Sequence, residues 1–130
     1  MTGRVLWLVD GNNVVGAAGD GWWNDPPAAA ARLLQSVAEW CRTHGDDVLV
    51  VFDGRPQPRL EQLAGGNLAV GFARRSGRDA ADDRIVELVD ERYGEEPSIT
   101  VVTSDRGLVG RLPPGVAVEG AGTFRRRLSP

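Results

Sequence analysis

The sequence contains no lysine, so all 15 of its basic residues are arginines. This absence excludes a Walker A phosphate loop, Schiff-base catalysis and any phospho-acceptor site that depends on a lysine. Histidine and cysteine are scarce, with one of each, His44 and Cys41. These two are too few for a zinc site of the usual kind, and one cysteine forms no internal disulfide. No nucleophile-elbow motif supports a Ser-His-Asp triad. Catalysis, if the chain has any, must therefore use carboxylates.

Long hydrophobic runs are also missing. The first apolar run, residues 5–9, is too short for a signal peptide or a membrane span. With a single cysteine nothing argues for export, so we expect a cytoplasmic protein with no membrane partner. A length of 130 residues with 42% hydrophobic and 25% charged residues is typical of one globular domain. We expect that domain to cover residues 1–122, followed by a short basic tail at 123–130.

Apolar runs alternate with segments of helical character along the chain. The runs predict five strands, at residues 4–9, 48–52, 68–73, 99–103 and 116–118. Helices are expected at residues 26–44, 59–64, 80–92 and 106–112. Strands that alternate with helices indicate an α/β fold with a mainly parallel sheet between two helical layers.

Three of the predicted strands run directly into an aspartate, namely Asp10, Asp53 and Asp105. Open α/β sheets place their ligands at the carboxyl ends of their strands, so these residues suggest one shared acidic site. Asp82 and Asp83 add two acids in the first turn of the 80–92 helix.

Each acid also has a purely structural interpretation. Asp10 suits a turn that closes a strand, and Asp105 suits the N-cap of the next helix. Asp82 and Asp83 complement a helix macrodipole. Clustered carboxylates repel one another unless a cation intervenes, however, and oxygen ligands without histidine or thiolate suit Mg²⁺ or Mn²⁺. Such a site can activate water for displacement at phosphorus.

Four short segments, in this order and spacing, resemble the NYN branch of the PIN-like nucleases, in particular its bacterial YacP-like group. These segments are residues 10–16 (DGNNVVG), 51–54 (VFDG), 81–85 (ADDRI) and 102–106 (VTSDR). Any one of them is a weak signal, whereas the ordered set spans most of the chain and is more specific.

The resemblance implies a three-layer PIN-like fold with a five-stranded sheet of order 3-2-1-4-5 and Mg²⁺- or Mn²⁺-dependent endoribonuclease activity. The residues that match the family's site are Asp10, Asn13, Asp82, Asp83 and Asp105. The four aspartates would bind the metal, with Asp53 in reserve, and Asn13 would orient Asp10 or the attacking water. The sequence departs from the family's site at two positions. Val109 stands where some NYN nucleases have a further acid, which leaves fewer metal ligands, and Asn12 stands where tyrosine is common.

The expected partner is single-stranded RNA, including message presented by a ribosome. Candidate phosphate contacts are Arg74, Arg75, Arg78 and Arg106, although the first three equally suit a solvated approach to a helix. We interpret the run at residues 125–127 as a solvated terminus rather than an RNA contact. Of Trp22 and Trp23, we expect one to pack over the sheet edge, and exposed tryptophans are suited to stacking on bases.

Two other functions remain open. One is a catalytically silent PIN-like module that binds RNA or a ribosome, favoured by the missing acid at Val109 and by the net charge of −3. The retained aspartates count against it, because a binding module gains nothing from clustered repulsive carboxylates. The other, a Rossmann-like nucleotide-binding protein, ranks last because no glycine-rich phosphate loop follows the first strand.

Overall fold

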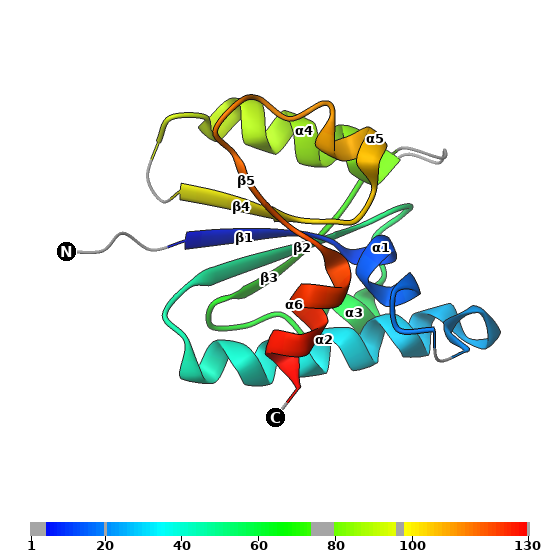
Figure 1. Cartoon of the computed structure of the whole chain (residues 1–130). Coiled ribbons are helices and arrows are strands. Elements are labelled where there is room, and N and C mark those ends of the chain that lie inside the picture. The colour runs from blue at the N-terminus through cyan, green and yellow to red at the C-terminus, as the bar shows by residue number, and fades with distance from the viewer. Residues whose placement is uncertain (1–4, 20, 74–79, 96–97, 130) are drawn as a thin grey trace.

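In a computed structural model, residues 5–19, 21–73, 80–95 and 98–129 form a three-layer α/β sandwich around one parallel sheet (Figure 1). The strands are β1 (Val5–Asp10), β2 (Asp47–Phe52), β3 (Leu68–Phe72), β4 (Ser98–Val102) and β5 (Ala117–Glu119). The helices are α1 (Gly11–Gly16), α2 (Pro26–Thr43), α3 (Pro58–Glu61), α4 (Ala80–Arg92), α5 (Arg106–Val109) and α6 (Ala121–Leu128), with a 3₁₀ turn η1 (Trp22–Asn24).

The strand order is β3-β2-β1-β4-β5, and all four pairings are parallel, which confirms the predicted fold class. β1 lies at the centre, and the chain moves outward to β2 and β3 on one side and to β4 and β5 on the other. The carboxyl end of β1 is therefore the point at which the strand order reverses, where sheets of this kind bind ligands.

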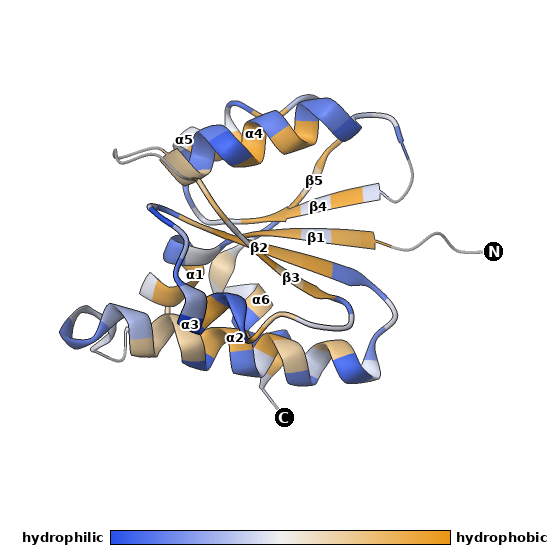
Figure 2. Ribbon diagram, turned by 180° about the vertical axis from the view of Figure 1, so that it is seen from behind, coloured by the Kyte–Doolittle hydropathy of each residue, from blue (hydrophilic) through white to orange (hydrophobic). Residues whose placement is uncertain are grey.

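The two faces of the sheet are covered by different helices (Figures 1 and 2). Leu33, Leu34 and Val37 of α2 and Phe124 of α6 pack with α1 and α3 in a core on one face. Ile85 and Val89 of α4 pack with α5 in a smaller core on the other face. β1 and β2 are buried nearly throughout, so they are nearly continuous apolar runs, whereas the edge strand β5 is largely exposed.

The segment that follows β1 is a helix, not the turn that the Asp-Gly-Asn-Asn sequence suggested. α1 begins at Gly11, immediately after Asp10. A Cβ atom at position 11 would stand 2.6 Å from the Phe52 ring and 2.9 Å from the Val51 carbonyl oxygen, so only glycine fits. This close approach holds the start of α1 against the end of β2.

Residues 121–128 form α6 where a basic tail was expected from residue 123, so that expectation was wrong. Phe124 is fully buried and packs against Trp7 and Trp40, with ring centroids 5.7 and 5.9 Å away. Arg127 of the same helix also contacts this aromatic cluster: its guanidinium lies over the Trp7 ring and donates to the Glu119 carboxylate. One buried aromatic residue thus joins the last helix to the main core.

Among the described residues, no helix combines the length and apolar character that crossing a membrane would require.

Candidate acidic site at the carboxyl ends of the strands

Asp10 is one of two buried polar or charged residues among the described ones, and only 4% of it is exposed. It ends β1, with neighbouring strands on both sides. Burial raises the pKa of its carboxyl from 3.8 to about 6. A hydrogen bond from the Thr103 hydroxyl and the nearby backbone N–H of Asn13 lower the pKa, whereas the charges of Asp53 and Asp105 raise it. A carboxylate so placed is stabilised by a proton or a cation.

Thr103, the other buried polar residue, links Asp10 to Asp105. Its hydroxyl donates to Asp10 Oδ2 at 2.9 Å and accepts from the Asp105 backbone N–H at 3.0 Å. Because β1 and β4 are adjacent and parallel, the two bonds fix the ends of both strands in register. Thr103 is not among the residues predicted from the sequence; the only local signal for it is a hydroxyl that ends the apolar run just before Ser104 and Asp105.

Asn12 and Asn13, at the start of α1, tie the end of β1 to the strands on either side. The Asn12 side-chain oxygen accepts from the Asp53 backbone N–H at 2.9 Å. The Asn13 oxygen accepts from the Ser104 backbone N–H at 2.8 Å. In this arrangement Asn13 positions the segment that carries Asp105.

Asp53 and Asp105 both cap helices. Asp53 Oδ1 accepts from the Ala81 backbone N–H at 2.8 Å, at the start of α4. Asp105 Oδ1 accepts from the backbone N–H groups of Gly107 and Leu108 at 2.8 and 3.2 Å, which is the N-cap role expected for α5. The charges of Asp53 and Asp105 nevertheless raise the pKa of Asp10, so both carboxylates belong to its acidic surroundings even though they also cap helices.

The two acids of α4 differ in orientation. Asp83 Oδ1 forms a 2.8 Å ion pair with Arg111 Nη1, on the chain that follows α5. Asp82 is half-buried and lies at the helical spacing of the buried residues Ile85 and Val89, so it shares the face of α4 that packs on β1 and β2. Of the two, Asp82 is therefore on the face directed toward the sheet.

Oxygen donors of the kind that Mg²⁺ and Mn²⁺ prefer surround Asp10, but they do not form a closed cage. In the part of the chain that the structure describes, no group of three or more His, Cys, Asp and Glu side chains is placed to hold an ion together. Mg²⁺ in particular keeps several waters and is commonly bound by one or two carboxylates plus substrate phosphates. The donor chemistry at Asp10 and Asp105 fits such an open site.

Of the residues predicted to contact RNA, some lie within the described part of the structure and others do not. Arg74, Arg75 and Arg78 lie outside the described residues. Arg106 is exposed at the start of α5, directly after Asp105. Trp22 packs against the core and Trp23 is 61% exposed, as expected for one packed and one open tryptophan.

The family model of the YacP-like NYN domain matches residues 7–109. The chain belongs to this family. Two crystal structures of Rae1 (YacP) from Bacillus subtilis are similar to it. The W164L mutant has a TM-score of 0.72 and 28% identity over 96% of this chain and 75% of that chain. The other structure has a TM-score of 0.71 and 28% identity over 95% of this chain and 72% of that chain. No curated protein matches the chain at a significant level. Membership in the YacP-like NYN family, with its PIN-like nuclease fold, supports a ribonuclease role and implies an RNA substrate.

Proposed function

We propose that the protein is a metal-dependent endoribonuclease whose site is centred on Asp10. The observation that carries the proposal is the buried Asp10 carboxylate, whose pKa is raised by burial and by two neighbouring aspartates at the carboxyl edge of the sheet. Keeping an ionised group there costs folding free energy, a cost typical of functional sites.

Asp10 and Asp105 would supply the first protein ligands for Mg²⁺ or Mn²⁺, with Asp82 as the third candidate from α4. The cation would lower the pKa of a bound water and neutralise charge that develops on the phosphodiester. Thr103 holds the Asp10 carboxylate in one orientation, and Asn13 fixes the backbone that carries Asp105. Asp83 is already neutralised by Arg111, so we assign it a weaker part.

The second candidate function is a catalytically silent module that binds RNA or a ribosome. It is favoured by Val109 at the position of a further acid, and by the absence of a three-ligand cluster among the described residues. The capping bonds of Asp53 and Asp105 give these acids a reason to be present without catalysis. The Thr103 hydroxyl donates to Asp10, but this bond does not offset the burial of the charge, because the pKa of the carboxyl stays raised at about 6; we therefore rank the nuclease first.

The decisive experiment is incubation with single-stranded RNA, and in parallel with ribosome-bound message, in Mn²⁺, in Mg²⁺ and in EDTA. We expect internal cleavage that depends on the metal. Asp105→Asn should reduce cleavage by roughly 100-fold or more, because it removes a charged ligand. Asparagine is as good an N-cap as aspartate, so α5 stays capped and the loss reports the charge.

A thermal-shift titration with Mn²⁺ tests the metal without activity. A cation bound only to the native protein raises the melting temperature by mass action. We expect this rise for the unmodified chain and a much smaller one for Asp105→Asn. Absence of cleavage on both substrates, together with an unchanged melting temperature, would favour the silent module.

A further inference from the structure

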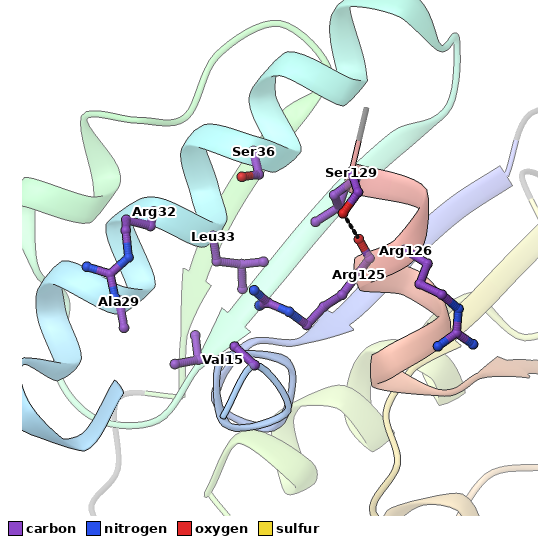
Figure 3. Close-up of a pocket in the computed structure, with 10 residues that line it drawn as sticks. Val15, Ala29, Arg32, Leu33, Ser36, Arg125, Arg126 and Ser129 are labelled. Carbon is purple, nitrogen blue, oxygen red and sulfur yellow. Dashed lines mark hydrogen bonds between the residues drawn. The ribbon is translucent and has the colours of Figure 1, made fainter. Parts of the chain in front are cut away.

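A cavity of about 390 Å³ opens between α1, α2 and α6, on the face of the sheet opposite α4. Figure 3 shows that it is formed by residues far apart in the sequence: Val15 from α1, Leu33 and Ser36 from α2, and the end of α6. None of the acidic site residues lines it. It is therefore a separate feature of the surface.

The charge of this cavity is positive. Arg32 of α2 and Arg125 and Arg126 of α6 line it, and none of its lining residues is an acid. Arg126 differs from the other two in that its Nη2 donates to the Thr123 hydroxyl at 3.1 Å. Within the described part of the chain, none of these three arginines forms an ion pair, whereas Arg84, Arg111 and Arg127 each pair with a carboxylate. In a protein of net charge −3, three arginines that line one cavity without a carboxylate partner among the described residues indicate a site for an anion.

The guanidinium of Arg125 is held in place before any ligand arrives. It is partly buried and its Nη1 donates to the Val14 carbonyl oxygen at 3.2 Å. Figure 3 shows it reaching from α6 toward α1 and α2, while the guanidinium of Arg126 lies on the other side of α6. One bond to Val14 leaves further N–H donors, and a guanidinium presents them in a planar fork that suits phosphate. The apolar side chains of Val15 and Leu33 in the same cavity strengthen that attraction by excluding water.

α1 connects this cavity to the acidic site. Asp10 immediately precedes α1, and Val15 lies near its end. At 1.5 Å per residue the two are roughly 8 Å apart along the helix, a distance that a short stretch of single-stranded RNA spans. We propose that the cavity lined by Arg32 and Arg125 binds a backbone phosphate of the RNA whose neighbouring segment lies at Asp10. The proposal rests on the proposed function in taking RNA as the substrate.

The test is binding of a labelled single-stranded oligoribonucleotide in EDTA, measured by fluorescence anisotropy over a range of salt concentrations. Two pairs of variants carry it. Arg32→Glu is matched by Arg42→Glu, the same charge change on the same helix at an exposed position outside the cavity. Arg125→Gln is matched by Arg126→Gln: Arg126 also lines the cavity, but its guanidinium bonds to Thr123 and lies on the other side of α6. Glutamine at position 125 keeps a side-chain donor for Val14, and melting temperatures check that each variant is folded.

We expect Arg32→Glu and Arg125→Gln to weaken binding roughly fivefold or more relative to their matched variants. The slope of log K against log salt should fall by about 0.7 for each lost phosphate contact. Equal weakening within each pair would show a general electrostatic effect and overturn the proposal, as would no RNA binding by the unmodified chain. A second experiment measures the melting temperature of the same proteins in the presence of inorganic phosphate. If phosphate raises the melting temperature in an Arg125-dependent way while RNA binding is the same in both pairs, the cavity binds free phosphate and the RNA assignment is wrong.

Cleavage in Mn²⁺, measured on the same proteins, separates this proposal from the nuclease. If Arg125→Gln binds RNA as tightly as Arg126→Gln and both cleave it, the cavity proposal fails and the nuclease stands. If Arg125→Gln binds weakly as expected but no protein cleaves either free RNA or ribosome-bound message, and Mn²⁺ leaves the melting temperature unchanged, the cavity proposal stands and the nuclease fails.

Discussion

Asp10 and Asp46 are two aspartates at opposite ends of β1, and their surroundings differ. Asp46 accepts a hydrogen bond on each oxygen, from the Val5 backbone N–H at 3.1 Å and from Trp7 Nε1 at 3.0 Å. Asp10 is more deeply buried and faces the charges of two other aspartates. The carboxylate of Asp46 joins β1 to the start of β2 and stabilises the fold, whereas that of Asp10 costs free energy unless a proton or cation neutralises it. The comparison separates an acid whose hydrogen bonds stabilise the fold from one whose buried charge does not, without reference to the family.

Activity should show the largest difference. We expect Asp10→Asn to reduce RNA cleavage by roughly 100-fold or more, since it removes a charged ligand but keeps an oxygen that accepts from Thr103. Asp46→Asn lies at the other end of the strand and should leave cleavage within about twofold at a temperature where the protein is folded. Initial rates in Mn²⁺ at saturating RNA measure both. Equal losses in the two variants would mean that Asp10 acts only through the fold.

Stability should separate the same two residues in the opposite direction. Because the folded pKa of Asp10 is about 6 and its ordinary value is 3.8, the folded state binds a proton between these pH values that the unfolded chain does not. Asp10 therefore lowers the free energy of unfolding as pH rises from about 4 to about 6, by about 3 kcal/mol in total, and the loss persists above that range.

Asp10→Asn removes this dependence. In EDTA at about pH 8 it should be more stable than the unmodified chain, by up to about 3 kcal/mol, with the difference shrinking toward zero near pH 4. Asp46→Asn should instead be less stable by about 1–2 kcal/mol, because one acceptor of a charge-assisted bond is lost. Urea unfolding at several pH values measures both. A constant difference between Asp10→Asn and the unmodified chain across this range would show that the carboxyl titrates normally.

The sequence predicted the elements that rely on local pattern. Continuous apolar runs mark the five strands, and the helical spacing of Leu33, Val37 and Trp40 marks the buried side of α2. Asp10 and Asp105 fall at the same edge of the sheet because parallel neighbours place their carboxyl ends together. The strand order came from the family resemblance, since periodicity alone does not fix which strands are adjacent.

What the sequence did not predict depends on contacts between distant residues. No helix was expected at α1, because Gly and Asn favour turns, whereas packing against Phe52 selects Gly11. A tail was expected at α6 because three consecutive arginines are typical of a solvated terminus. The helix is held in place by Phe124, which is buried only because Trp7 and Trp40 lie beside it. Hydrogen bonds made by the side chains of Asn12, Asn13 and Thr103 join residues more than 40 positions apart in the sequence. A local sequence pattern does not predict such bonds.

The smallest effect is expected at Asp83, which resembles Asp46 in having a partner within the protein. Its ion pair with Arg111 is exposed on both sides, with 40% and 44% of the side chains accessible, so Arg111→Ala should lower stability by less than about 1 kcal/mol. Asp83→Asn should change cleavage by no more than about threefold, because this acid is directed toward Arg111. Asp82→Asn, on the face of α4 that packs on the sheet, should reduce cleavage at least tenfold more than Asp83→Asn if Asp82 completes the metal site. Rates in Mn²⁺ for the two matched asparagine variants decide between the acids. A larger loss at Asp83 than at Asp82 would reverse this assignment and mean that the Arg111 pair breaks when the site is occupied.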